Sequence, residues 1–88
     1  MAAKNEDILF LVDKSSFPQN CWELDDFLDV LEEYYYIEFI DIDNPTAFYK
    51  YALKEAQSGK YELVIPVTRN FYVRDKLRME GVGLVVCL

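Results

Sequence analysis

Short apolar runs alternate with amphipathic segments along this chain, and the alternation predicts an α/β domain. Residues 8–12 (ILFLV) and 63–67 (LVIPV) are continuous apolar runs of strand length, which is typical of strands buried in a sheet. Residues 36–42 (YIEFIDI) are expected to form another strand between them. Residues 13–20 carry serines and a proline and are expected to form a loop.

Two segments between these runs have helical spacing. Residues 20–23 (NCWE) match a capping box with Asn20 as the N-cap, and the helix after it repeats apolar residues at positions 24, 27, 28 and 31. Trp22 is expected on the side opposite this apolar stripe. Asn44 and Pro45 are typical of a second helix start, and Ser58 and Gly59 indicate its end.

Two arrangements are open after Pro66, because the apolar stripe of the next segment is thin. Residues 68–73 could continue a strand and turn at residues 74–76 into an antiparallel strand. Alternatively, residues 70–80 form a helix that ends at Gly81, and residues 82–88 form a fourth parallel strand. The first arrangement gives a thioredoxin-like β-α-β-α-β-β sheet with flanking helices, and the second a small flavodoxin-like β-α-β-α-β-α-β parallel sheet.

Composition sets the class of protein. Eighty-eight residues correspond to one domain, residues 1–88, and 52% hydrophobic content with seven Tyr, six Phe and one Trp argues against disorder. No secretory signal or membrane-spanning stretch is evident, so a cytoplasmic location and no membrane partner are expected. The net charge of −7 disfavours direct nucleic-acid binding.

The inventory of reactive side chains limits the chemistry. There is no histidine, which excludes Ser-His-Asp and Cys-His catalysis and makes a zinc site improbable. The glycines at 59, 81 and 83 form no phosphate-binding loop, and we expect neither a metal nor a cofactor. The two cysteines, Cys21 and Cys87, are far apart in sequence, and Cys87 falls in an apolar run typical of the core.

The order of these segments resembles the thioredoxin and glutaredoxin superfamily over residues 8–80. Residues 17–21 (FPQNC) are similar to the aromatic-Cys-x-x-Cys segment, residues 39–45 (FIDIDNP) to the second strand and its acidic turn, and residues 64–67 (VIPV) to the segment with the cis-proline. The resemblance implies a cis peptide at Pro66 beside a groove near Phe17 and Trp22.

The chain departs from that family at the dithiol. If Cys21 is the second cysteine of the pair, Pro18 stands in the place of the nucleophile, so ordinary disulfide exchange is excluded. The chain therefore resembles a degenerate member of that family, one that lacks the CxxC pair. Cys21 falls at the start of a helix, which favours a thiolate, whereas the acids at 23, 25 and 26 oppose it. Cys21 is the one candidate catalytic residue.

The function predicted first is a non-catalytic protein-interaction module. It would bind a protein through the loop from Pro18 to Trp22 and the acidic helix, and a basic partner would complement that helix. The expected contact residues are Phe17, Pro18, Trp22, Asp25, Asp26, Asp29 and Pro66. One alternative is a monothiol oxidoreductase or redox sensor that uses Cys21.

A second alternative is an acidic, phage-type inhibitor or nucleic-acid mimic. It rests on residues 23–43, which contain nine acids and no base. Residues 69–78 contain four bases and one acid and could pair with the acidic segment of a second copy, so a homodimer is also a hypothesis.

Overall fold

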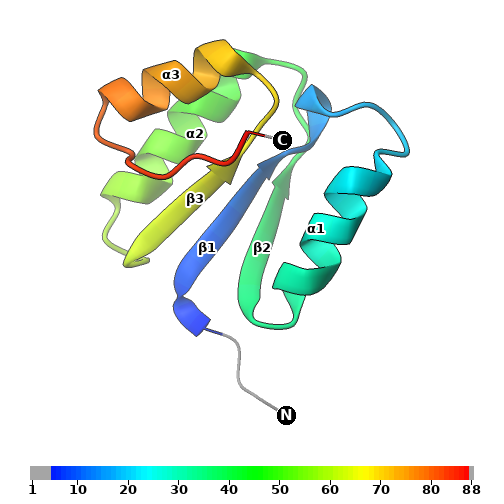
Figure 1. Cartoon of the computed structure of the whole chain (residues 1–88). Coiled ribbons are helices and arrows are strands. Elements are labelled where there is room, and N and C mark those ends of the chain that lie inside the picture. Colours follow the sequence, from blue (N-terminus) through cyan, green and yellow to red (C-terminus); the bar gives the residue numbers. More distant parts are fainter. Residues whose placement is uncertain (1–4, 88) are drawn as a thin grey trace.

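The computed structural model describes residues 5–87 and has three strands and three α-helices (Figure 1). No helix in that range is long and apolar enough to cross a membrane. Along the chain the elements are β1 (Asn5–Asp13), a 3-10 turn η1 (Lys14–Ser16), α1 (Trp22–Glu32), β2 (Tyr35–Ile40), α2 (Pro45–Gln57), β3 (Leu63–Val67) and α3 (Phe71–Met79).

The three strands form one parallel sheet in the order β2-β1-β3, with helices on both faces (Figure 1). The central strand β1 pairs Phe10 with Ile37 of β2 on one side and with Ile65 of β3 on the other. Parallel strands of this kind need crossover connections, which α1 and α2 supply. The predicted α/β class is confirmed.

Each face of the sheet has its own apolar cluster, because successive side chains of a strand point to opposite faces. On one face Phe10 and Val12 of β1 pack with Leu24 and Leu28 of α1. On the other face Leu9 and Leu11 pack with side chains of α2 and α3, among them Phe48, Ala52, Val73 and Leu77. The helical spacing of residues 24, 27, 28 and 31 is confirmed, since Leu24 and Leu28 are buried and Phe27 and Leu31 are packed against them.

Helix starts follow the expected chemistry at α2 and differ at α1. Asn44 caps α2 by accepting from the N–H groups of Thr46 and Ala47, and Pro45 is the first helical residue. At α1 the N-cap is Cys21, which makes no side-chain capping bond, and the expected capping box is wrong. Asn20 adopts instead a left-handed conformation with φ of 60°, which asparagine tolerates better than most residues.

The segment after Pro66 is a helix, so the alternative with a strand over residues 68–73 and a turn at residues 74–76 into an antiparallel strand is wrong. Asn70 caps α3 through a 3.1 Å hydrogen bond from the N–H of Val73, and Gly81 follows the helix with φ of 95°. Val86 then pairs in parallel with Val67, so the chain returns to the free side of β3. The predicted fourth strand over residues 82–88 is reduced to this bridge within the described range.

Pro66 explains why the last pairing is so short. The N–H of Val86 donates to the carbonyl of Pro66, and the N–H of Thr68 donates to the carbonyl of Val86. The preceding rung of a parallel ladder would need an N–H on residue 66 to reach the carbonyl of Leu84, and proline has none. The peptide bond before Pro66 is trans, like every other bond over residues 5–87, so the cis peptide implied by the resemblance is absent.

Candidate functional site

The outer face of α1 presents a tryptophan at one end of an acidic stripe. Trp22 is 68% exposed, and Asp26, Asp29 and Glu33 follow it on the same side at helical spacing. Val30, 65% exposed, lies beside them. Trp22 lies opposite the apolar stripe of α1 as predicted, and its side chain is exposed. This face of α1 therefore combines a large exposed aromatic side chain with a row of carboxylates.

A hollow of about 620 Å³ lies beside the start of α1. The loop before the helix forms much of its wall, and its lining includes Lys14, Phe17, Pro18, Cys21, Asp25 and Asp41. Four of the predicted site residues therefore meet at one concave surface: Phe17, Pro18, Cys21 and Asp25. Asp26 and Asp29 lie on the exposed side of α1 instead.

Two predicted contact residues are buried in the fold. Phe17 is only 8% exposed and packs in the cluster beneath α1. Pro66 is a fully buried residue of β3 and does not line the hollow, so the expected groove between Phe17, Trp22 and Pro66 is not formed. The burial of Pro66 follows from its place in β3, which has β1 on one side and Val86 on the other.

Both cysteines are free thiols of intermediate exposure. Cys21 packs at the margin of the cluster beneath α1 and also reaches the hollow. Cys87 lies next to Val86 in the C-terminal segment, and its intermediate exposure differs from the expected core position.

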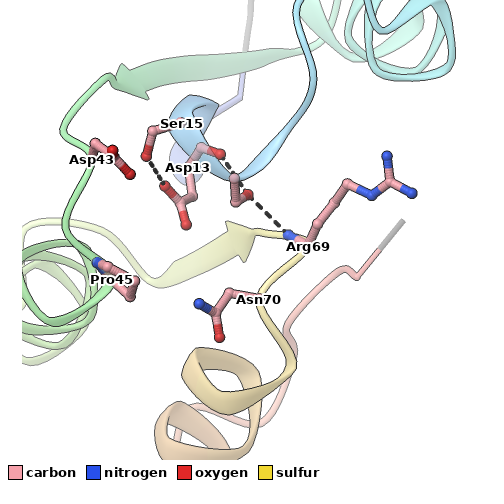
Figure 2. A pocket seen from close by; sticks show the side chains of 7 residues that line it. Asp13, Ser15, Asp43, Pro45, Arg69 and Asn70 are labelled. Carbon is pink, nitrogen blue, oxygen red and sulfur yellow. Dashed lines mark hydrogen bonds between the residues drawn. The ribbon is translucent and has the colours of Figure 1, made fainter.

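A second polar site, not foreseen from the sequence, lies at the carboxyl ends of β1 and β3 (Figure 2). Asp13, the last residue of β1, is 2% exposed, and Oδ2 of Asp13 accepts a 2.9 Å hydrogen bond from the hydroxyl of Thr68. Thr68 itself is fully buried and accepts from the N–H of Asn70 at 3.1 Å. The bonds join the ends of two neighbouring strands to the start of α3.

Ser15 and Ser16 complete this network. The hydroxyl of Ser16 donates to the carbonyl of Asp13 at 2.8 Å and accepts from the N–H of Arg69 at 3.0 Å. The hydroxyl of Ser15 lies 2.7 Å from the carbonyl of Ile42 and 3.2 Å from Oδ1 of Asp13. A hydroxyl has one proton to donate, and the shorter contact favours Ile42. Oδ1 of Asp13 therefore keeps capacity to accept another hydrogen bond.

The protein environment raises the pKa of Asp13 above its usual value. Loss of hydration on burial is the main cause, and the nearby carboxylate of Asp43 adds to it; the hydrogen bond from Thr68 and the neighbouring hydroxyl groups of Ser15 and Ser16 act in the opposite direction. Asp13 and Asp43 line a hollow of about 280 Å³ with Ser15, Ser16, Pro45, Arg69 and Asn70. The guanidinium of Arg69 points away from Asp13 (Figure 2).

The site occupies the position where open parallel sheets commonly bind ligands. The chain leaves β1 toward β2 and leaves β3 toward the opposite edge, so the strand order reverses between β1 and β3. The sequence does carry a signal for this site, because Asp13 and Thr68 are polar residues that each directly follow an apolar strand run. Their pairing needed the parallel register, in which Val12 lies opposite Val67.

The described part of the chain, residues 5–87, contains no group of three acidic or cysteine side chains arranged to hold a metal ion. The comparisons with protein-family models, curated proteins and solved structures found no match to this chain.

Proposed function

We propose that this chain is a non-catalytic protein-binding domain on a small flavodoxin-like frame. The flavodoxin-like arrangement is favoured over the thioredoxin-like one by the helix at residues 71–79 and the parallel bridge between Val67 and Val86. The binding surface is the outer face of α1 together with the loop from Pro18 to Trp22. The observation that supports this proposal most strongly is the exposed Trp22, which lies at the end of a row of carboxylates and next to the loop that lines the hollow of about 620 Å³.

The partner on this proposal has a basic surface. Residues 22–33 carry six acids and no base, so an interface here would form faster and more tightly at low salt. Trp22 would supply the apolar anchor, because a tryptophan that becomes buried on binding is a common hot spot. Pro18 and Asp25, which line the hollow, would contact the same partner at its rim.

Affinity capture with two matched variants tests this proposal. The binding-face variant combines Trp22→Ala, Asp26→Lys and Asp29→Lys. The control combines Met79→Ala, Glu62→Lys and Glu80→Lys, which are exposed positions away from α1 and change the net charge equally. We expect a host-lysate partner that is retained by the wild type and the control and lost by the binding-face variant. Equal retention by both variants would contradict the proposal.

The same preparation separates the other two hypotheses. Displacement of the captured partner by duplex DNA would favour the nucleic-acid mimic. Rapid alkylation of Cys21 at neutral pH, with loss of function in Cys21→Ser, would favour the redox hypothesis. Turnover in an insulin reduction assay would overturn a non-catalytic role.

A small-ligand function is a second candidate, favoured by the free acceptor capacity of Asp13 in the hollow it shares with Asp43. Two carboxyl groups without an inward-pointing cation suit a ligand with a primary ammonium group. NMR titration with putrescine, and with succinate as the matched acid, tests it. We expect putrescine alone to shift the signals of Ser15, Ser16 and Asn70, and Asp13→Asn to abolish the shifts. Equal shifts with succinate would contradict this candidate.

A further inference from the structure

Strand β2 forms an open edge of the sheet. It pairs with β1 on its inner side, and no strand within residues 5–87 pairs with its outer side (Figure 1). An edge strand exposes a row of backbone N–H and carbonyl groups that can pair with another extended chain. The opposite edge differs, because Val86 already bonds to β3 there.

Apart from the charge of Glu38, β2 lacks the devices that usually protect an edge. Natural edges carry lysine, proline or a bulge that hinders pairing. Tyr35–Ile40 contains neither lysine nor proline, and the irregularity in its pairing with β1 lies between Asn5 and Leu9, outside β2. The strand therefore runs evenly from Tyr36 to Ile40.

Exposed apolar side chains gather on and beside this strand. Phe39 and Tyr36 are 51% and 41% exposed, and they point to opposite faces of the sheet because strand side chains alternate. Tyr34 and Ile42, which flank the strand, are 51% and 52% exposed. Aromatic side chains on a strand interact well with β-branched residues of a neighbouring strand, so an added strand would gain side-chain contacts on both faces.

The negative charge on and beside β2 favours a basic strand as its partner. Residues 32–43 contain five acids and no base: Glu32, Glu33, Glu38, Asp41 and Asp43. In a pair of antiparallel β2 strands from two copies, these acids would oppose one another, which is destabilising. A segment with alternating basic and β-branched residues pairs with the backbone, and it can place β-branched side chains beside Phe39 on one face and basic side chains beside Tyr36 and Glu38 on the other.

We infer that the outer edge of β2 captures an extended, basic peptide segment of a partner, which adds a strand next to Tyr35–Ile40. This docking surface is distinct from the outer face of α1, and the inference does not depend on the function proposed above. Main-chain bonds would provide much of the affinity, and the contacts to Phe39 and Tyr36 would provide selectivity.

A seven-residue peptide with lysine at odd and valine at even positions is the probe. We expect it to shift and protect the amide signals of residues 35–40, and its Kd to rise with salt. One control peptide carries glutamate in place of every lysine. A second carries proline at the central position, which removes a backbone donor. Both controls should bind at least about tenfold more weakly, as expected when one good contact of about 1.4 kcal/mol is lost.

Three protein variants locate the site. Phe39→Lys should raise the Kd of the lysine–valine peptide about fivefold to tenfold, the size of effect for one aromatic contact. Phe71→Lys on α3 is the matched control, since it makes the same change at an exposed phenylalanine. Both substitutions also remove a cation–π contact, that of Lys14 with the Phe39 ring and that of Arg74 with the Phe71 ring. Trp22→Ala should leave peptide binding unchanged, which separates this surface from α1.

Several results would overturn the inference. Amide shifts confined to α1 or to the hollow at Pro18 would show that the peptide binds elsewhere. Equal binding of the glutamate peptide would show that charge does not select the peptide. Another contrary result would be a dimer, seen in sedimentation, whose formation protects the β2 amides without peptide. If Phe39→Lys abolishes that dimer, the edge binds a second copy of the chain. Absence of binding at millimolar peptide would also overturn it.

Discussion

The hydroxyl of Thr68 donates a 2.9 Å hydrogen bond to Oδ2 of Asp13, although the two residues are 55 positions apart in the chain. Both side chains are buried; Asp13 is the last residue of β1, and Thr68 directly follows β3. The bond therefore joins β1 and β3 at the end of the sheet where the second polar site lies. A buried carboxyl group that loses such a donor has no water to replace it.

Thr68→Val should lower the free energy of unfolding by about 1–3 kcal/mol, because it keeps the shape of the side chain and removes the donor to Asp13. Urea unfolding followed by circular dichroism measures the change. Thr46→Val is the control, since Thr46 is exposed at the start of α2 and only its backbone N–H is bonded to Asn44. A loss no larger than that of the control would contradict the prediction.

The raised pKa of Asp13 gives stability a specific pH dependence. The folded state holds the proton to higher pH than the unfolded state, so the carboxyl group of Asp13 contributes a penalty that appears as pH rises from about 4 through the folded-state pKa. Asp13→Asn, which keeps a neutral side chain, should therefore gain stability relative to the wild type between acid and neutral pH. Urea unfolding over this range measures the difference, and NMR titration of the carboxyl carbon gives the pKa. A pKa at or below the ordinary aspartate value would contradict the prediction.

Cys21→Ser should stabilise the protein or leave it unchanged, with a gain of up to about 1 kcal/mol. The thiol makes no capping bond at the start of α1, and a serine hydroxyl at the N-cap can accept one from the first turn. Thermal unfolding measures the effect. Asn44→Ala is the reference variant and should lower the free energy of unfolding by about 1 kcal/mol, because the Asn44 side chain accepts two hydrogen bonds at the start of α2. A clear loss in Cys21→Ser would show that the thiol has a structural role the capping argument misses.

Tyr51 should ionise later than an ordinary tyrosine. Its hydroxyl donates a 2.6 Å bond to Oε1 of Glu38, and this bond, with burial and the negative charge of Glu38, raises the pKa of Tyr51 to about 12. The neutral form is favoured in the folded state, so this contribution to stability should decline as pH rises from about 10 toward 12. NMR titration of the ring carbons should show a late tyrosine signal that is missing in Tyr51→Phe. Its persistence in that variant would assign the late signal to another tyrosine.

The sequence predicted the elements with strong local signals. Residues 63–67 form β3 as expected, and the Asn44-Pro45 start of α2 is as predicted, because capping and helical phase act within a few residues. The expected start of α1 was wrong by one position, because the N-cap is Cys21 and not Asn20. Asn20, Cys21 and Glu23 together fit a capping box, and the left-handed backbone at Asn20 prevails over it.

What the sequence by itself determined is the α/β class, the apolar faces of its helices and the lack of a dithiol, since each follows from local pattern or composition. Only the tertiary structure decided the rest. By local pattern, residues 68–80 could form a strand or a helix. They form a helix, which buries Val73 and Leu77 in the apolar cluster on one face of the sheet. The site at Asp13 and Thr68 and the open edge of β2 arise from the order and register of parallel strands. Those contacts join residues far apart in the chain, and no local pattern specifies them.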